Sequence, residues 1–194
     1  MEQRTRTGLL FGSFNPVHTG HLIIASHFTQ YTDMSEVWFV LSPRNPFKGE
    51  AEMLDQEERL YLLKLATEDN PAFKVCETEL HMPTPSYTIN TLKKLTREHP
   101  HREFGLLIGE DNLKDFDKWK DHQDILKMVG IYVYPRGEES FLPFLDHPGV
   151  QKITAPRIDI SSSMIRKAFR QGKNPRYMLP DKVLSQIKVK GFYL

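Results

Sequence analysis

The sequence contains little that would place it outside the cell or in a membrane. Its single cysteine, Cys76, excludes an internal disulfide. No apolar run approaches the roughly 20 residues that a membrane helix needs. The N-terminal segment MEQRTRTGLL contains neither a long apolar core nor a small-residue cleavage site. We therefore expect a cytoplasmic protein without a membrane partner.

The sequence also has almost no net charge. It contains 26 Lys and Arg residues against 25 Asp and Glu residues, which gives a formal charge of +1. A protein that binds nucleic acid or an anionic membrane through its overall charge needs a large basic excess. We therefore expect no nucleic-acid partner, and any recognition of phosphate has to be local.

Internal repeats, low-complexity tracts and linkers are absent as well. The 194 residues suffice for one domain with a sizeable core. Apolar runs alternate with segments of helical spacing, and these runs are TGLLFGSF, EVWFVLSP, FKVCETEL, EFGLLIG, GIYVYPR and VQKITAP. This alternation predicts a single α/β domain, 1–194, with a doubly wound parallel sheet, helices on both faces and a C-terminal helical segment at about 161–194.

One turn between a predicted strand and a predicted helix contains two histidines. The segment GLLFGSF is typical of a strand and LIIASHF of a helix, so GSFNPVHTGH joins them at the carboxyl edge of the sheet. A helix N-terminus presents unpaired N–H groups, and Gly12 lets the backbone approach a ligand. His18 and His21 add further donors, which favours a phosphate site. We expect the helix end to disfavour charged imidazoles until an anion binds.

Three other interpretations of this turn are weaker. A capping or core role would be the better prediction for a single histidine. A zinc site needs another convergent ligand, and His27 lies about 120° from His21 around a helix. A dinucleotide fingerprint needs G-x-G-x-x-G, which is absent.

The same turn resembles the G-x-F-x-P-x-H-x-G-H signature of the nucleotidyltransferase superfamily, whose members transfer a nucleotidyl group and release pyrophosphate. The fixed positions all match, at Gly12, Phe14, Pro16, His18, Gly20 and His21. A second superfamily motif, I-S-S-T-x-I-R, matches ISSSMIR, with Ser163 in place of the usual threonine. Its serines predict a helix N-cap, and Arg166 lies one turn beyond Ser162. Alone, this segment would predict only a cap and a solvated charge.

Two further segments resemble motifs of the nicotinate-nucleotide adenylyltransferases. They are SYTINTL, similar to S-Y-T-x-x-T-L, and GEDNLKDFDKW, similar to G-x-D followed at a fixed spacing by tryptophan. The four motifs occur in the family's order between Gly8 and about Arg170. The resemblance implies a Rossmann-like fold and transfer of AMP from ATP to nicotinate mononucleotide, which gives deamido-NAD and pyrophosphate in NAD biosynthesis.

The resemblance also implies roles for individual residues. The expected catalytic residues are His18, His21 and Arg166. The expected ATP-binding residues are Gly12, Ser13, Phe14, His18, His21, Gly109, Asp111, Ser161, Ser162 and Arg166. The expected nicotinate mononucleotide-binding residues are Asn15, Lys48, Thr88, Trp119 and Arg136, the last because it follows a predicted strand. Mg²⁺ is implied as a cofactor held mainly by the phosphates of ATP, without protein ligands.

Several alternatives remain open. Another acceptor, nicotinamide mononucleotide or phosphopantetheine, would use the same two phosphate motifs. A non-catalytic nucleotide-binding module could share the fold. Without the resemblance, Trp119 would be a hydrophobic anchor, Thr88 a helix cap and Arg136 an exposed loop charge. The sequence is compatible with a homo-oligomer.

Overall fold

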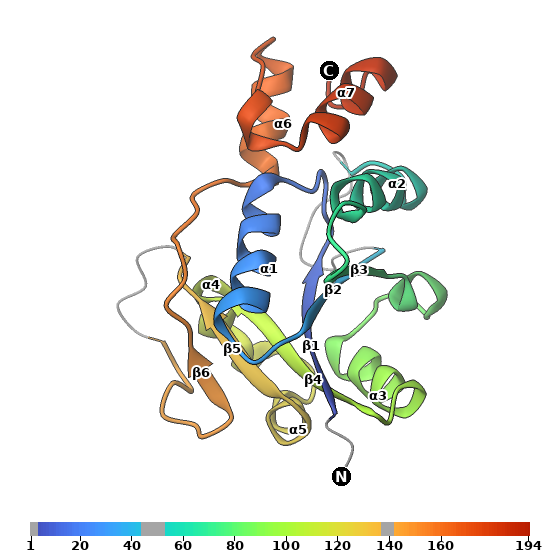
Figure 1. Ribbon diagram of the computed structural model, residues 1–194. Coiled ribbons are helices and arrows are strands. Elements are labelled where there is room, and N and C mark those ends of the chain that lie inside the picture. The colour runs from blue at the N-terminus through green and yellow to red at the C-terminus, as the bar shows by residue number, and fades with distance from the viewer. Residues whose placement is uncertain (1–3, 44–52, 137–141) are drawn as a thin grey trace.

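A computed structural model describes residues 4–43, 53–136 and 142–194 of the chain. In these ranges six parallel strands form one sheet, in the order β3-β2-β1-β4-β5-β6 (Figure 1). The strands are β1 (Thr5–Gly12), β2 (Glu36–Leu41), β3 (Phe73–Cys76), β4 (Arg102–Gly109), β5 (Gly130–Tyr134) and β6 (Val150–Lys152). The helices are α1 (Thr19–Tyr31), α2 (Gln56–Thr67), α3 (Thr88–Glu98), α4 (Glu110–Lys114), α5 (His122–Met128), α6 (Ser162–Arg170) and α7 (Asp181–Lys190), with short 3₁₀ helices η2 (Thr78–His81), η3 (Phe116–Lys118) and η4 (Arg176–Met178). None of these helices has the length and apolar composition needed to cross a membrane.

The strand order confirms the predicted doubly wound sheet. From β1 the chain winds outward through β2 to β3, and then returns to place β4 on the other side of β1. Adjacent side chains of β1 point to opposite faces: Leu10 packs in the core beside α1 and α2, whereas Leu9 packs in the core beside α3 and α5. Both faces are therefore covered by helices, as buried parallel strands require.

The change of winding direction between β1 and β4 marks the place where sheets of this kind bind ligands, beyond the carboxyl ends of the strands. Gly12 ends β1 and Gly109 ends β4. A Cβ added at Gly109 would lie 2.4 Å from Oδ1 of Asp111, so the Asp111 side chain would have to move away. The glycine at this strand end thus lets the Asp111 side chain lie against the backbone.

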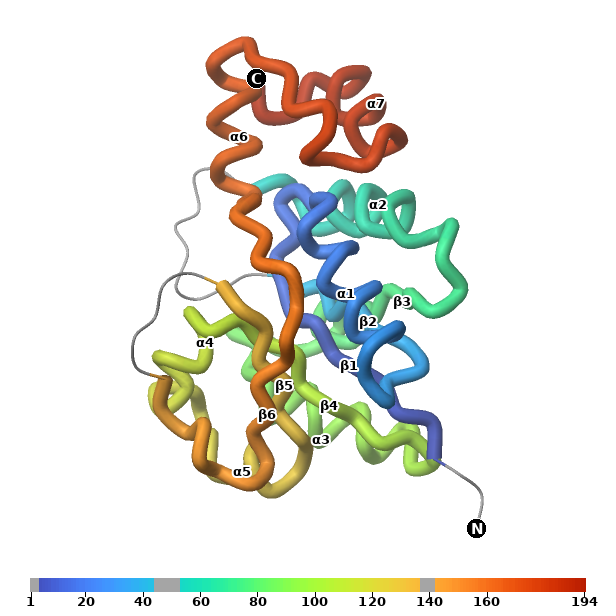
Figure 2. Tube along the Cα trace, turned by 60° about the vertical axis from the view of Figure 1, so that its left-hand side comes forward, coloured from blue at the N-terminus to red at the C-terminus, as the bar shows by residue number. Residues whose placement is uncertain are grey.

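The C-terminal segment lies at the carboxyl end of the sheet, where α7 packs on α2 and α6 lies beyond the start of α1 (Figures 1 and 2). Ile165 and Phe169 of α6 and Val183 of α7 belong to the same core as Leu10 of β1. The last two helices are therefore part of the single domain and bring their residues to the side of the sheet where ligands are expected.

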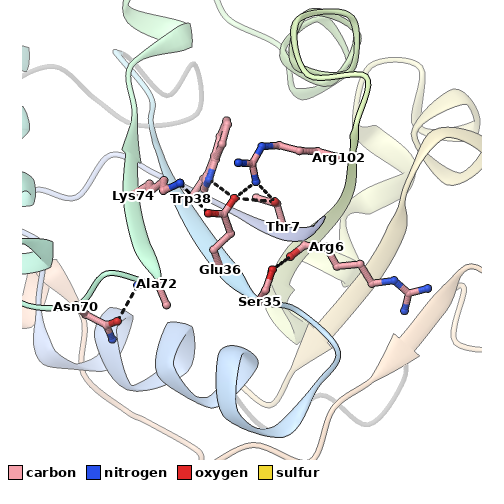
Figure 3. Close-up of polar contacts among 9 residues, drawn as sticks. All are labelled: Arg6, Thr7, Ser35, Glu36, Trp38, Asn70, Ala72, Lys74 and Arg102. Carbon is pink, nitrogen blue, oxygen red and sulfur yellow. Dashed lines mark hydrogen bonds and ion pairs between the residues drawn. The ribbon is translucent and has the colours of Figure 1, made fainter. Parts of the chain in front are cut away.

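The opposite, amino end of the sheet is held by a buried carboxylate. Glu36 accepts hydrogen bonds from Thr7 Oγ1 and Trp38 Nε1, both at 2.9 Å, and its carboxylate also pairs with Lys74 and Arg102 (Figure 3). Burial raises the pKa of Glu36, but the hydrogen bonds from Lys74 and Thr7 and the charge of Arg102 outweigh it and hold this pKa below its usual value. The cluster ties the first residues of four strands together, far from the glycines that end β1 and β4.

Candidate active site

The turn after β1 is rigidly packed. Phe14 has a φ of 42°, in the left-handed region that favours glycine, and its ring is buried. That ring contacts His21 edge-on, with 5.0 Å between the ring centroids, and Phe39 of β2 at 5.7 Å. The predicted ATP-binding residue Phe14 therefore supports the turn with its side chain, so that only its backbone can face a nucleotide.

The two histidines are in direct contact. Their rings stack with a centroid distance of 3.6 Å, and the His18 backbone N–H donates to His21 Nδ1 at 3.2 Å. Because Nδ1 of His21 accepts this bond, the ring of a neutral His21 carries its proton on Nε2. His18 is the N-cap of α1, so both imidazoles lie at the positive end of a helix.

His18 is held in its neutral form. It is 4% exposed, and burial, followed by the charge of Arg136, lowers its pKa from 6.5 to about 3. The disfavoured positive charge agrees with the sequence-based expectation, but it results from burial and from the charge of Arg136. Within the described residues, Nδ1 of His18 is buried without a hydrogen-bond partner.

The second phosphate motif docks directly on the first. Ser161 is the N-cap of α6, and its Oγ accepts a hydrogen bond from the Met164 backbone N–H at 3.2 Å. The Ser162 hydroxyl donates to the carbonyl of Pro16 at 2.9 Å. Arg166 completes the contact through a bond from NH1 to the carbonyl of Asn15 at 2.9 Å. Two segments that are remote in sequence thus form one unit at the carboxyl end of β1.

A buried arginine that the sequence analysis did not identify donates hydrogen bonds to the backbone of this turn. Arg59 of α2 is 1% exposed, and its guanidinium donates to four backbone carbonyls, those of Ser13 (2.7 Å), Ser42 (2.9 Å), Pro43 (2.7 Å) and Leu54 (3.0 Å). The first two carbonyls follow β1 and β2. A single side chain therefore fixes the ends of two neighbouring strands where the site begins.

Asn15, an expected acceptor-binding residue, is hydrogen-bonded within the protein through its side chain. Its side chain is buried behind the turn, where Oδ1 accepts hydrogen bonds from the Tyr193 hydroxyl at 2.8 Å and from the Leu54 N–H at 3.2 Å. Burial raises the pKa of Tyr193, so its hydroxyl stays protonated and can donate. These contacts make Asn15 a link between the C-terminal end of the chain and the turn.

A cavity of about 250 Å³ opens beside the histidines. Six of the predicted site residues line it: Gly12, Ser13, His21, Thr88, Trp119 and Arg136. A smaller cavity of about 20 Å³ shares His21 and Arg136 with it and is also lined by His18 and Ile158. The site thus brings together the phosphate turn, the start of α3 and the segment before α5, which the sequence places far apart.

Arg136 lies between the two cavities and is held by acidic residues. Its backbone N–H donates to Glu110 at 3.0 Å, and its Nε lies 3.7 Å from Asp111 Oδ2. Glu110 is buried and also pairs with Lys152 at 2.8 Å. The predicted adenosine residue Asp111 and the predicted acceptor residue Arg136 are therefore neighbours. Lys48, the other predicted acceptor cation, lies outside the described residues.

Glu79, Tyr87 and Lys120 are among the residues that line the large cavity without having been predicted. Glu79, buried in η2, accepts hydrogen bonds from Ser86 Oγ at 2.9 Å and Thr91 Oγ1 at 2.7 Å. Tyr87 and Lys120 flank the predicted residues Thr88 and Trp119 in the sequence, and that adjacency was the only signal for them. As for metals, the described ranges contain no group of three or more His, Cys, Asp or Glu residues that could hold an ion.

The chain resembles proteins of one kind in both sequence and structure. The cytidylyltransferase-like family matches residues 9–168. The probable nicotinate-nucleotide adenylyltransferase of Flavobacterium johnsoniae is 43% identical over 97% of this chain and 98% of its own length, and that of Bacteroides fragilis is 44% identical over 95% and 92%. The fold is also that of nicotinic acid mononucleotide adenylyltransferase from Plasmodium falciparum, solved in complex with NaAD, with a TM-score of 0.81 and 17% identity over 97% of both chains.

Proposed function

The chain belongs to the nicotinate-nucleotide adenylyltransferases of the cytidylyltransferase-like family, and from this premise we propose how its site carries out the reaction. The enzyme transfers AMP from ATP to nicotinate mononucleotide and releases pyrophosphate, a step of NAD biosynthesis. One observation carries the proposal for the site. The two phosphate motifs are hydrogen-bonded into one unit, through Ser162 and Arg166, beside a cavity lined by Thr88 and Trp119.

The reaction needs no general base from the protein. An oxygen of the acceptor's phosphate attacks the α-phosphorus of ATP, a new P–O bond forms, and the bond to the β-phosphate oxygen breaks as pyrophosphate leaves. The second pKa of a phosphate ester is about 6, so the attacking oxygen is largely ionised at neutral pH. Catalysis then depends on in-line placement and on neutralising the charge that collects on the bridging and leaving oxygens.

The phosphates of ATP are assigned to the unit formed by the two motifs. His21 donates from Nε2 to the oxygens of the reacting α-phosphate, and the neutral His18 beside it adds a donor without requiring a proton from solvent. Ser161, Ser162 and Arg166 hold the β- and γ-phosphates at the N-terminus of α6, where the helix dipole favours anions. The adenosine lies near Gly109 and Asp111.

The acceptor is assigned to the large cavity. Trp119 and Thr88 contact its pyridine ring, and Arg136 faces its phosphate from the side that His21 also lines. The ion pair with Asp111 keeps the Arg136 side chain near the junction of the two cavities. Asn15 acts indirectly, through the turn that it supports.

Mg²⁺ enters with ATP in this proposal. Oxygen atoms are its preferred ligands, and substrate phosphates commonly supply several of them. Bound in this way, the ion would offset the charge of the leaving pyrophosphate, while the protein contributes donors rather than metal ligands. ATP and nicotinate mononucleotide are then the small molecules that the protein meets in the cytoplasm.

The experiment that tests the function offers the protein ATP and Mg²⁺ with one acceptor at a time and identifies the products by mass. Nicotinate mononucleotide should give deamido-NAD and pyrophosphate in equal amounts. Nicotinamide mononucleotide and phosphopantetheine serve as competing acceptors. A product from phosphopantetheine alone, or nucleotide binding without any product, would overturn the proposal.

A further inference from the structure

A lysine that the proposed mechanism does not use lines the large cavity next to Trp119. Lys120 follows Trp119 in the sequence and lines the same cavity. Its Nζ lies 4.6 Å from the centroid of the Tyr87 ring, and Tyr87 is the N-cap of α3 next to Thr88. The ammonium group is therefore held over an aromatic face between the two segments that are assigned to the pyridine ring.

The ammonium group of Lys120 differs from that of its neighbour Lys118. Lys118 also lines the cavity, but its Nζ donates to Asp115 at 2.6 Å. Within the described part of the chain Lys120 forms no ion pair, and its Nζ lies over the ring of Tyr87. A cation on an aromatic face keeps its capacity to bind an anion from its open side.

Glu79 lines the same cavity, but it forms no ion pair with Lys120 in the described part of the chain. Glu79 directs its two oxygens to the hydroxyls of Ser86 and Thr91, at 2.9 and 2.7 Å. These bonds fix the segment that contains Tyr87, on which Lys120 rests. Glu79 therefore does not neutralise the positive charge of Lys120, which lines the cavity.

We propose that Lys120 is a specificity-determining residue whose ammonium group binds the carboxylate on the pyridine ring of the acceptor. This inference rests on the proposed function, since it assigns a partner to one end of the same substrate. Nicotinate and nicotinamide mononucleotides share the ribose and the phosphate and differ only in carboxylate against amide. A lysine at the pyridine end therefore separates them by charge, whereas Arg136 and His21 face groups that both acceptors share.

The test compares both acceptors in matched variants. Lys120→Gln should lower kcat/KM for nicotinate mononucleotide about tenfold, the scale of one partly solvated charge-assisted contact, and leave the value for nicotinamide mononucleotide within about twofold. Lys118→Gln is the control, because its charge is already paired with Asp115, and it should leave the ratio of the two values unchanged. Lys120→Arg should restore most of the ratio.

A salt titration of the unmodified enzyme provides a second measurement that does not depend on how a variant folds. Raising ionic strength from about 0.05 to 0.5 M should reduce the preference for nicotinate mononucleotide, because a partly exposed ion pair is screened. An equal loss for both acceptors in Lys120→Gln, or an unchanged ratio in both experiments, would overturn the role of Lys120. Absence of deamido-NAD with the unmodified enzyme would instead overturn the proposed function, so the two failures are distinguishable.

Discussion

Arg166 donates a hydrogen bond from NH1 to the backbone carbonyl of Asn15, with 2.9 Å between the two atoms and 151 positions between the residues. The Ser162 hydroxyl adds a second bond to the next carbonyl, that of Pro16. The N-terminus of α6 is thereby fixed against the N-terminus of α1. Two helix ends, each favourable for an anion, are thus held next to each other, as the proposed polyphosphate site requires.

Arg166→Lys tests whether the guanidinium group of Arg166 also binds the phosphates of ATP. Lysine keeps the charge but loses the planar fork that can bind two phosphate oxygens at once. We expect the dissociation constant for ATP to rise about tenfold, with that for nicotinate mononucleotide nearly unchanged, as titration calorimetry would show. Arg170→Lys, at an exposed position of the same helix, is the control. Equal weakening of both ligands would mean that Arg166 only supports the fold.

His21→Ala tests the donor nearest the reacting phosphorus. We expect kcat to fall at least about 100-fold, or roughly 3 kcal/mol, as for the loss of one preorganised donor to developing charge. ATP binding should change much less, because the contact strengthens in the transition state. His27→Ala is the matched control on α1, since His27 stacks on Tyr31 with 4.6 Å between the centroids. Near-normal turnover by folded His21→Ala protein would remove His21 from the mechanism.

Arg59→Lys tests the buried support of the turn. Lysine cannot reproduce bonds to Ser13, Ser42 and Pro43 together, so buried carbonyls lose their donors. We expect the free energy of unfolding, measured by urea denaturation, to fall by about 3 kcal/mol, which is the scale of leaving buried polar groups unpaired. We also expect kcat to fall, since Ser13 lines the cavity. Arg97→Lys, exposed on α3, should change neither quantity, and a stable, fully active Arg59→Lys protein would contradict the role assigned to Arg59.

The pKa of His18 predicts a pH dependence of stability. The pKa is about 3 in the folded protein and 6.5 in the reference state, so between these values the unfolded chain binds a proton that the folded chain does not. Stability therefore falls as the pH drops through this window. When the pH is lowered from 7 to 5, His18 should therefore reduce the free energy of unfolding by about 2 kcal/mol. His18→Gln should remove that part of the pH dependence, whereas His101→Gln, at an exposed site, should retain it; identical pH profiles for the two variants would exclude a buried neutral His18.

Trp119→Ala tests the stacking contact that we propose for the pyridine ring of the acceptor. A base stacked on an aromatic ring is stabilised by about 1–3 kcal/mol, so Trp119→Ala should raise KM for both mononucleotides by comparable factors. The preference in kcat/KM for nicotinate over nicotinamide mononucleotide should be at least about 10³ in the unmodified enzyme, because charge and hydrogen-bond polarity, rather than shape, distinguish them. Much of this preference should remain in Trp119→Ala. Comparable efficiency with both acceptors before mutation would contradict this account of the pocket.

The fold could be predicted from the sequence because its signals are local. Buried parallel strands are continuous apolar runs, as in Glu36–Leu41, where every residue is buried, and helical spacing separates them. The phosphate turn was recognisable for the same reason, since its glycines and histidines are adjacent in the chain. The N-cap role of Ser161 follows from the same local rule and is confirmed.

The supports of the site could not be predicted, because they depend on contacts between distant segments. Arg59 stands in QEERLYLL among other charged residues and has the pattern of a solvated side chain, yet it is buried against four carbonyls. Asn15 was expected to bind the acceptor, and its side-chain hydrogen bonds with Tyr193 and Leu54 could not be predicted. Nothing near Asn15 in the sequence indicates a partner at the other end of the chain.

The most direct test of the central claim follows the phosphorus that is attacked. The enzyme is incubated with Mg²⁺, nicotinate mononucleotide and ATP labelled only at the α-phosphorus, and the products are separated. If the unit formed by His18, His21 and Arg166 directs attack at the α-phosphorus, all transferred label is found in deamido-NAD and the pyrophosphate is unlabelled. Labelled AMP or labelled orthophosphate, formed without a labelled dinucleotide, would contradict the account.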